Sequence, residues 1–293
     1  MTKEQTILFG IGAQKAGTSW LHHQLSQHPE IHFSLKEVHY WDTVRGPQPA
    51  PFRIRSDLEA EALKRRFRLR QSLGLMSEGQ RRKVAVKTSW AKLLRPIEQD
   101  SDHYKEFLAA GSEGKKIIGD ITPLYALLSS STFSEMAELA DDVRFIFIMR
   151  DPVDRIISGI RHFSRRVDLT EADVYDHLDR LIKDILADDH NVNLLRSRYE
   201  TTLKALDRAV APDRLLVLFY EDLFSEQTRI AVQDFLGLQS ELPWETERRQ
   251  NPAKGASFSG SDAQRRDLRE RLDPTYRYVR ERFGDAVPQR WLA

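Results

Sequence analysis

Cysteine is absent from the 293-residue sequence. Without thiols the chain cannot form disulfide bonds, thiolate nucleophiles, zinc–thiolate sites or cysteine-bound iron–sulfur clusters. No apolar run approaches the roughly 18 residues that a membrane-spanning helix requires, and the apolar stretch at 7–13 is too short for a secretory signal. The sequence therefore predicts a cytoplasmic protein without a transmembrane segment.

An excess of charge of either sign is also lacking, because 45 basic residues face 44 acidic ones and the net charge is +1. A general nucleic-acid binder would carry a strong positive field, so no nucleic-acid partner is expected. Hydrophobic residues at 40% and charged residues at 30% are typical of a globular chain. No internal repeat or linker divides the sequence, which predicts a single domain over 1–293.

Apolar runs that indicate strands alternate with helical segments along the chain. The run at 143–149 and the one at 214–220 are nearly continuous, as in parallel strands buried on both faces. Shorter strands are expected at 6–12, 31–33 and 115–120, helices at 19–26, 57–75 and 170–210, and a proline-rich loop at 44–52. This alternation predicts an α/β fold in which helices flank a central parallel sheet.

A glycine-bearing loop, Gly12-Ala-Gln-Lys15-Ala-Gly17-Thr18-Ser19, follows the first expected strand. Between a strand and a helix, such a loop directs backbone N–H groups and the helix dipole at an anion. A dinucleotide fingerprint fails because its third glycine is replaced by Lys15. A Walker A loop is nearly matched, but Thr18 stands where its lysine belongs.

Two segments resemble the nucleotide-binding motifs of sulfotransferases that use 3′-phosphoadenosine 5′-phosphosulfate (PAPS). QKAGTSWL at 14–21 resembles their 5′-phosphosulfate loop, and RFIFIMRDPVDRIISG at 144–159 resembles their 3′-phosphate-binding segment. Two further features of that family are matched less specifically: its late Lys-Gly loop, by Lys254-Gly255, and its residue near the nucleotide, by Tyr199. The resemblance implies a P-loop-like three-layer domain and a nucleotide site built from Lys15, Ala16, Gly17, Thr18, Ser19, Trp20, Arg150, Ser158, Tyr199, Lys254 and Gly255.

LKEVHYW at 35–41 resembles a KEPHFF-like stretch of carbohydrate sulfotransferases of the heparan sulfate type, in which the glutamate is the proposed general base. By that resemblance Glu37 is the first candidate for the base and His39 the second, and Lys15 would stabilise the leaving phosphate. Pairing of Glu37 with Lys36 or Arg150, and a structural role for His39, are the alternatives. One departure from the glycan-directed pattern is Ile121, which replaces a lysine before Thr122-Pro123.

The predicted activity is transfer of a sulfuryl group from PAPS to a hydroxyl, or to an amine, of a small-molecule or glycan acceptor, without a metal. Residues 44–115 are expected to form an insertion on the acceptor side. Within it, residues 53–83 hold ten basic and four acidic side chains, which favours either a wall for an anionic acceptor or a solvated helix face. A P-loop kinase or NTPase with Asp120 as its magnesium ligand, and a non-catalytic binding protein, are the rival hypotheses; acceptor identity and oligomeric state are open.

Overall fold

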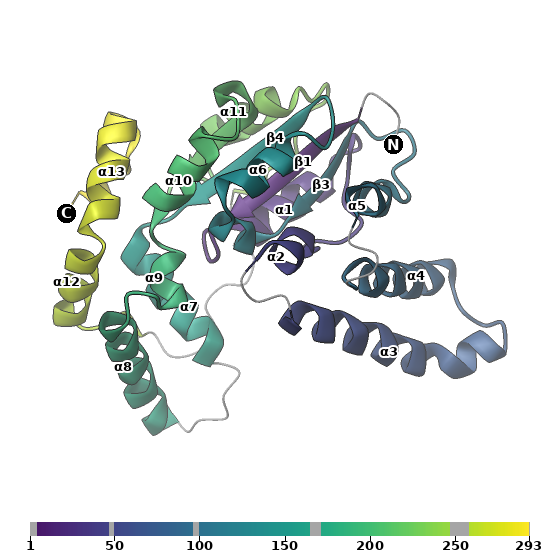
Figure 1. Ribbon diagram of the computed structural model, residues 1–293, viewed down its shortest axis with the longest axis horizontal. Helices are drawn as coiled ribbons and strands as arrows, with labels where there is room; N and C mark the ends of the chain where they lie inside the picture. The colour runs from purple at the N-terminus through teal and green to yellow at the C-terminus, as the bar shows by residue number, and fades with distance from the viewer. Residues whose placement is uncertain (1–4, 47–49, 96–99, 165–170, 247–257, 293) are drawn as a thin grey trace.

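A five-stranded sheet forms the centre of the computed structural model, which describes residues 5–46, 50–95, 100–164, 171–246 and 258–292 (Figure 1). Its spatial order is β2-β3-β1-β4-β5, and all four neighbouring pairs are parallel. The strands are β1 (Thr6–Gly12), β2 (Ile31–His32), β3 (Ile117–Ile121), β4 (Val143–Met149) and β5 (Leu215–Phe219). The predicted parallel sheet is confirmed.

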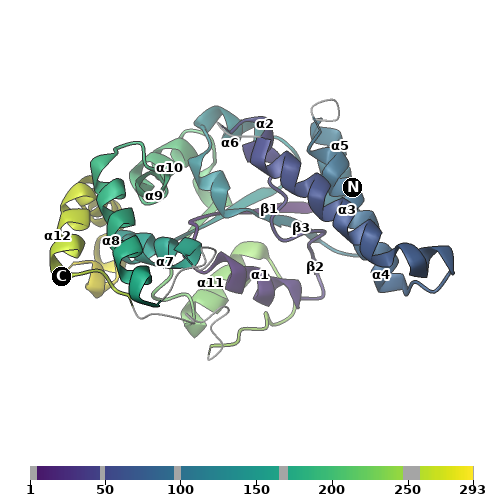
Figure 2. The same ribbon diagram turned by 90° about the horizontal axis from the view of Figure 1, so that it is seen from below.

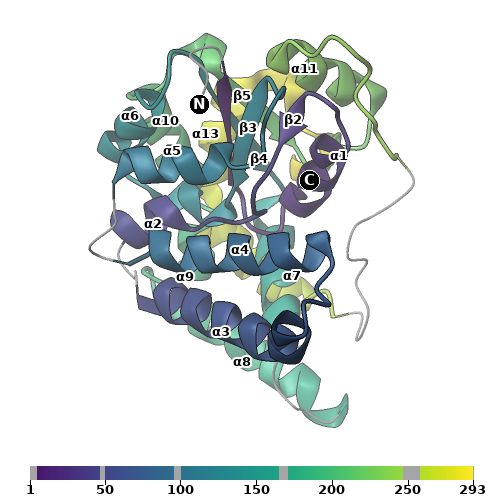
Figure 3. The same cartoon turned by 90° about the vertical axis from the view of Figure 1, so that its right-hand side faces the viewer.

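Helices cover both faces of this sheet. Figure 3 shows α1 and α11 on one side of the strands and α5, α6 and α10 on the other. The helices are α1 (Thr18–Ser26), α2 (Tyr40–Val44), α3 (Ala50–Ser72), α4 (Glu78–Leu93), α5 (Ser101–Ala109), α6 (Ser130–Ala137), α7 (Pro152–Ser164), α8 (Glu171–Ala187), α9 (Val192–Leu195), α10 (Tyr199–Asp207), α11 (Glu226–Leu236), α12 (Asp262–Arg271) and α13 (Asp273–Phe283). The architecture is the predicted three-layer α/β fold.

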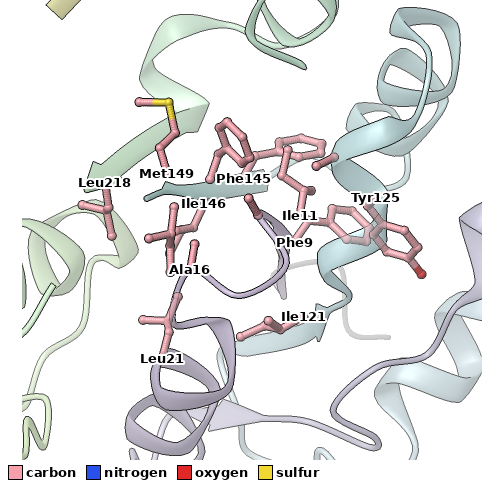
Figure 4. Packing of buried hydrophobic residues seen from close by; sticks show 14 of the residues in the cluster. Phe9, Ile11, Ala16, Leu21, Ile121, Tyr125, Phe145, Ile146, Met149 and Leu218 are labelled. Atoms are coloured by element: carbon pink, nitrogen blue, oxygen red, sulfur yellow. The ribbon is translucent and has the colours of Figure 1, made fainter. Parts of the chain in front are cut away.

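The two central strands, β1 and β4, form the middle of the core. Figure 4 shows Phe145 and Ile146 on opposite faces of β4, with Ile146 directed toward Leu21 of α1. All three side chains are buried. A strand covered on both faces needs apolar residues at successive positions, which explains why its sequence shows no polar alternation.

The loop predicted at 44–52 is wrong in part. Helix α2 ends at Val44, and α3 already begins at Ala50, so that Pro51 lies in its first turn. Proline is well tolerated there, because the N–H that it lacks has no acceptor within the helix. The prolines therefore mark the start of a helix; residues 47–49 lie outside the described part of the chain.

Helices α3 and α4 form a long hairpin that projects from the body of the molecule (Figures 1 and 2). A capping box begins α4, in which Ser77 accepts from the backbone N–H of Gln80 and the Gln80 side chain accepts from that of Ser77. Among the described helices, none has the length and apolar character needed to cross a membrane.

Because the strands are parallel, their carboxyl ends meet at one edge of the sheet. The glycine-bearing loop follows β1, Arg150 follows β4, Thr122 follows β3 and Tyr220 follows β5. Ligands of open α/β sheets bind at this edge, in the crevice where the strand order reverses beside β1.

Candidate active site

The glycine-bearing loop requires glycine at the residue that precedes α1. Gly17 has φ +93°, and a Cβ on it would lie 2.5 Å from Cδ2 of Leu223 and 3.1 Å from Cδ2 of Tyr220. Any larger residue would combine an unfavourable backbone conformation with a clash. Helix α1 starts at Thr18, and the backbone N–H groups of Trp20 and Leu21 already donate to the oxygen of Gly17. The N–H groups of Thr18 and Ser19 lie at the N-terminus of the helix, where anions bind.

Arg150 reaches back to this loop across the edge of the sheet. Its Nη1 donates to the backbone oxygen of Lys15 at 3.2 Å, and its guanidinium lies over the ring of Tyr220, 4.6 Å from the centroid. Within the described residues its buried Nε has no hydrogen-bond partner. The structure thus brings together the two motifs that were predicted to bind phosphate, with donor capacity unused.

Two further arginines lie close to Arg150, and sequence reasoning missed both. Arg155, fully buried on α7, donates to Ser197 Oγ at 2.5 Å and to the backbone oxygen of Asn193 at 2.6 Å. Arg196 donates to Oε1 of Gln14 in the loop at 2.8 Å. Little in the sequence indicated either residue. Arg155 lies one helical turn before Ser158, and Arg196 belongs to a charged stretch without a recognised motif.

These three arginines form a positive cluster, and their hydrogen-bond acceptors among the described residues are all neutral oxygens. Burial lowers the pKa of Arg155 to about 10, and the positive charges of Arg196 and Arg150 add to that effect. Nη1 of Arg155 and Nε of Arg196 are also buried without a partner in the described part of the chain. Buried cations without a carboxylate are costly, so the arrangement favours binding of an anion.

The other predicted nucleotide residues occupy different positions. Ser158 is half-buried on α7 and Ala16 is buried in the loop. Trp20 is 2% exposed and packs edge-on against Trp244, and Tyr199 is 1% exposed. Side-chain contact from these two rings with a bound nucleotide is therefore not expected.

Tyr199 instead supports the backbone of Arg150. Its hydroxyl donates to the Arg150 backbone oxygen at 2.8 Å and accepts from the Arg150 backbone N–H at 3.4 Å. It acts as a positioning residue behind the arginine cluster. Lys254 and Gly255 lie outside the described residues, so their predicted role stays a prediction.

Lys36 connects the loop to the candidate base. Its Nζ donates to Ser19 Oγ at 2.7 Å and to Oε1 of Glu37 at 2.8 Å. The pairing of Glu37 with Lys36 that the sequence left open is therefore present. Through Lys36, Glu37 is also linked to Ser19 in the first turn of α1, the helix that follows the glycine-bearing loop.

His39 lies between two carboxylates. Its Nδ1 is 2.7 Å from Oδ2 of Asp42 and its Nε2 is 3.5 Å from Oε2 of Glu37. Burial disfavours the imidazolium, but the hydrogen bonds to both carboxylates raise the pKa of His39 to about 9. Burial likewise opposes ionisation of Glu37, yet His39 and Lys36 lower its pKa to about 2.

At neutral pH, Glu37 is therefore ionised and His39 is protonated. The Glu37 side chain is 30% exposed and that of His39 is 8% exposed. A proton acceptor must be unprotonated and must reach the substrate. Glu37 is thus the unprotonated and the more exposed of the two candidates, although a pKa this far below neutrality makes its carboxylate a weak base. His39 contacts Glu37 and holds it in place.

The raised pKa of His39 predicts a pH-dependent contribution to stability. Because the folded pKa of about 9 exceeds the ordinary histidine pKa of 6.5, the contribution is complete below pH 6.5 and is lost as the pH rises through about 9. We expect the free energy of unfolding of the protein, relative to His39→Gln, to fall by roughly 3 kcal/mol over that range. Denaturant unfolding of both proteins at a series of pH values between 6.5 and 9 measures this difference in free energy.

His103→Gln is the matched control, since His103 is 58% exposed on α5. Its difference from the unchanged protein should vary little with pH. If the difference in free energy of unfolding between His39→Gln and the unchanged protein is equally independent of pH, folding does not raise the pKa of His39.

A buried polar network supports the segment that carries the candidate base. The carboxylate of Asp120, at the end of β3, accepts from the hydroxyls of Tyr104 at 2.8 Å, Tyr125 at 2.7 Å and Thr122 at 2.7 Å. The same carboxylate accepts from the backbone N–H of Val38 at 3.3 Å. Asp120 is wholly buried and occupied by these donors, so its environment is that of a structural residue.

The sequence also places five histidines close together, at 22, 23, 28, 32 and 39, and two of them contact backbone oxygens of separate segments. His28 contacts the backbone oxygen of Ser240, while His32 contacts that of Ala110. No group of three or more metal-ligating side chains suited to a metal ion occurs among the described residues.

The chain belongs to the sulfotransferase family, because the model of that family matches residues 8–241. The crystal structure of a sulfotransferase from Alicyclobacillus acidocaldarius is similar over 98% of both chains, with a TM-score of 0.63 and 20% identity. The sulfotransferase domain of the Synechococcus PCC 7002 olefin synthase is similar over 93% of this chain and 96% of that one, with a TM-score of 0.49 and 17% identity. No curated protein sequence matches the chain.

Proposed function

We propose that this sulfotransferase transfers a sulfuryl group from PAPS to a hydroxyl. The observation that carries the proposal is the cluster of Arg150, Arg155 and Arg196, which lies beside the glycine-bearing loop and hydrogen-bonds to no carboxylate of the described residues. PAPS carries a 3′-phosphate and a 5′-phosphosulfate, so it supplies negative charge both to the arginine cluster and to the glycine-bearing loop. In this proposal Arg150 and Ser158 bind the 3′-phosphate, while the first turn of α1 and Lys15 bind the 5′-phosphosulfate.

In the proposed reaction, the acceptor oxygen forms a bond to sulfur as the bond between sulfur and the bridging phosphate oxygen breaks. The proton of the acceptor hydroxyl passes to Glu37, and 3′-phosphoadenosine 5′-phosphate leaves with the electron pair of the broken bond. Sulfuryl transfer is similar to phosphoryl transfer, in which enzymes act by positioning and charge stabilisation. Lys15 is therefore assigned the charge on the leaving oxygen.

The acceptor approaches from the side of α2 and α3 in this proposal. The ring of Phe52, in the first turn of α3, stacks on His39 with centroids 4.0 Å apart. Lys87 of α4 pairs with Glu59 of α3 at 2.6 Å, which joins the two helices of the hairpin close to that end. Residues 44–115 would thus shape the acceptor side, and a small-molecule or glycan hydroxyl fits the exposed edge of Glu37.

Calorimetric titration of the purified protein with 3′-phosphoadenosine 5′-phosphate tests the donor. We expect binding without added metal in about the micromolar range, which corresponds to roughly −8 kcal/mol. ATP with magnesium is the control and should bind far more weakly. Tighter binding of ATP–magnesium would contradict the assignment of Arg150 and favour a nucleotide triphosphate as the substrate.

A further inference from the structure

The hairpin of α3 and α4 exposes an apolar surface that no described segment covers. Nine large apolar side chains are exposed in the described part of the chain, and five of them belong to this hairpin. These five are Ile54, Leu58, Leu69, Leu73 and Leu75, each between 60% and 77% exposed. The other four are on α8, α9, α11 and the C-terminal turn, so the hairpin alone gathers them into one surface.

Four of the five follow the periodicity of a helix. With 3.6 residues per turn, Ile54, Leu58 and Leu69 fall within one third of the circumference of α3, and Leu73 continues this stripe in the turn after the helix, where its N–H donates to the oxygen of Leu69. The opposite side of the helix, which includes the buried Ala60, faces the protein. Helix α3 therefore leaves apolar side chains exposed on the side that does not face the protein.

The hairpin as a whole is strongly basic. Residues 50–93 carry twelve basic and four acidic side chains, a net charge of +8, whereas the whole chain has a net charge of +1. The remainder of the protein is thus negative by seven charges. Arg65 falls within the apolar stripe, and Arg55, Arg66 and Arg68 flank it at helical spacing.

We propose that the hairpin docks on an anionic lipid surface. The leucines would enter the boundary between headgroups and acyl chains, and the arginine side chains beside them would meet the lipid phosphates. A polyanion such as a glycan or a nucleic acid would match the charge but leave the leucines in water. A second copy of the chain would bring two hairpins of +8 together, which charge repulsion opposes.

Docking in this way would bring the candidate active site close to the lipid surface. The stripe begins at Ile54, two residues after Phe52, whose ring stacks on His39. An acceptor carried by a lipid would then lie on the same side as Glu37. The docking surface itself is independent of the reaction, so binding to lipid and transfer of sulfate can fail separately.

Flotation of the full chain with vesicles tests the proposal. The vesicles consist of phosphatidylcholine alone or of phosphatidylcholine mixed with phosphatidylglycerol. We expect the protein to float only with the anionic vesicles, and less so at high salt. Leu58→Ser/Leu69→Ser/Leu73→Ser should weaken binding by about tenfold or more, and Arg65→Gln/Arg66→Gln/Arg68→Gln by roughly a hundredfold.

Matched controls carry equivalent changes on other exposed surfaces. Val192→Ser/Ile230→Ser and Arg208→Gln/Arg277→Gln/Arg280→Gln should float as the unchanged protein does. Thermal melts check that each variant is folded, since changes to exposed side chains alter stability little.

Three outcomes would overturn the proposal. The first is failure of the unchanged protein to float with anionic vesicles. The second is flotation that the arginine changes abolish and the leucine changes leave intact, because it would indicate general affinity for polyanions. The third is a dimer in light scattering that the leucine changes dissociate, which would assign the surface to a second copy.

Discussion

Arg150→Ala is expected to weaken binding of 3′-phosphoadenosine 5′-phosphate by roughly a hundredfold to a thousandfold, or about 3–4 kcal/mol. The guanidinium lies at the carboxyl end of β4, oriented by the ring of Tyr220 and the backbone oxygen of Lys15. Its Nε has no hydrogen-bond partner among the described residues, and the guanidinium carries the positive charge that a phosphate attracts. Charge-assisted hydrogen bonds of this kind are about twice as strong as neutral ones. Calorimetry measures the change.

Arg144→Ala is the matched control, because Arg144 lies on the same strand and pairs with Asp142 at 3.0 Å. Its loss should leave the affinity for the bisphosphate unchanged within about twofold, although stability decreases. If the Arg150→Ala protein binds the bisphosphate as tightly as the unchanged protein does, Arg150 does not bind the 3′-phosphate.

Glu37→Gln is expected to lower kcat by about a hundredfold to ten-thousandfold, the range attributed to general base catalysis. Glutamine keeps the size of the side chain but cannot accept the proton of the acceptor. Glu37 is separated from the loop by Lys36, which contacts both. The affinity for 3′-phosphoadenosine 5′-phosphate should therefore change little, while turnover decreases.

Transfer of radiolabelled sulfate from PAPS to a panel of sugars and simple alcohols measures the effect. Glu135→Gln is the control, since Glu135 is an exposed carboxylate that pairs with Arg45. Unchanged turnover of the Glu37→Gln protein would move the role of base to His39. In that case His39→Gln, and not Glu37→Gln, would lose activity, which separates the two candidates.

The strands and their order of appearance could be read from the sequence for a physical reason. β4 and β1 are covered on both faces, so nearly every residue in them must be apolar, and that demand leaves a continuous run in the sequence. The boundaries of the helices were harder to predict from the sequence. The prolines at 47, 49 and 51 predict a loop, but the first turn of α3 accepts Pro51 because its N–H needs no acceptor within the helix.

The candidate site was predictable where a residue acts through local geometry. Gly17 is needed for a left-handed turn before α1, and that requirement is visible in its immediate neighbours. Arg155 and Arg196 were not predictable, because their importance depends on packing beside Arg150 from separate elements. The roles of Trp20 and Tyr199 changed for the same reason: burial, which a motif does not report, directs both side chains into the core.

By itself the sequence determined the α/β class, the parallel sheet and the family, because each depends on apolar periodicity or on short segments of contiguous residues. Tertiary structure alone decided which charges meet. It joined Lys36 to Ser19 and placed His39 between Glu37 and Asp42, and thereby set which of these groups are ionised. It also left one apolar side of α3 uncovered in a region of strong positive charge. The ionisation of a group and the exposure of a face depend on distances between residues far apart in the chain, and those distances exist only once the chain has folded.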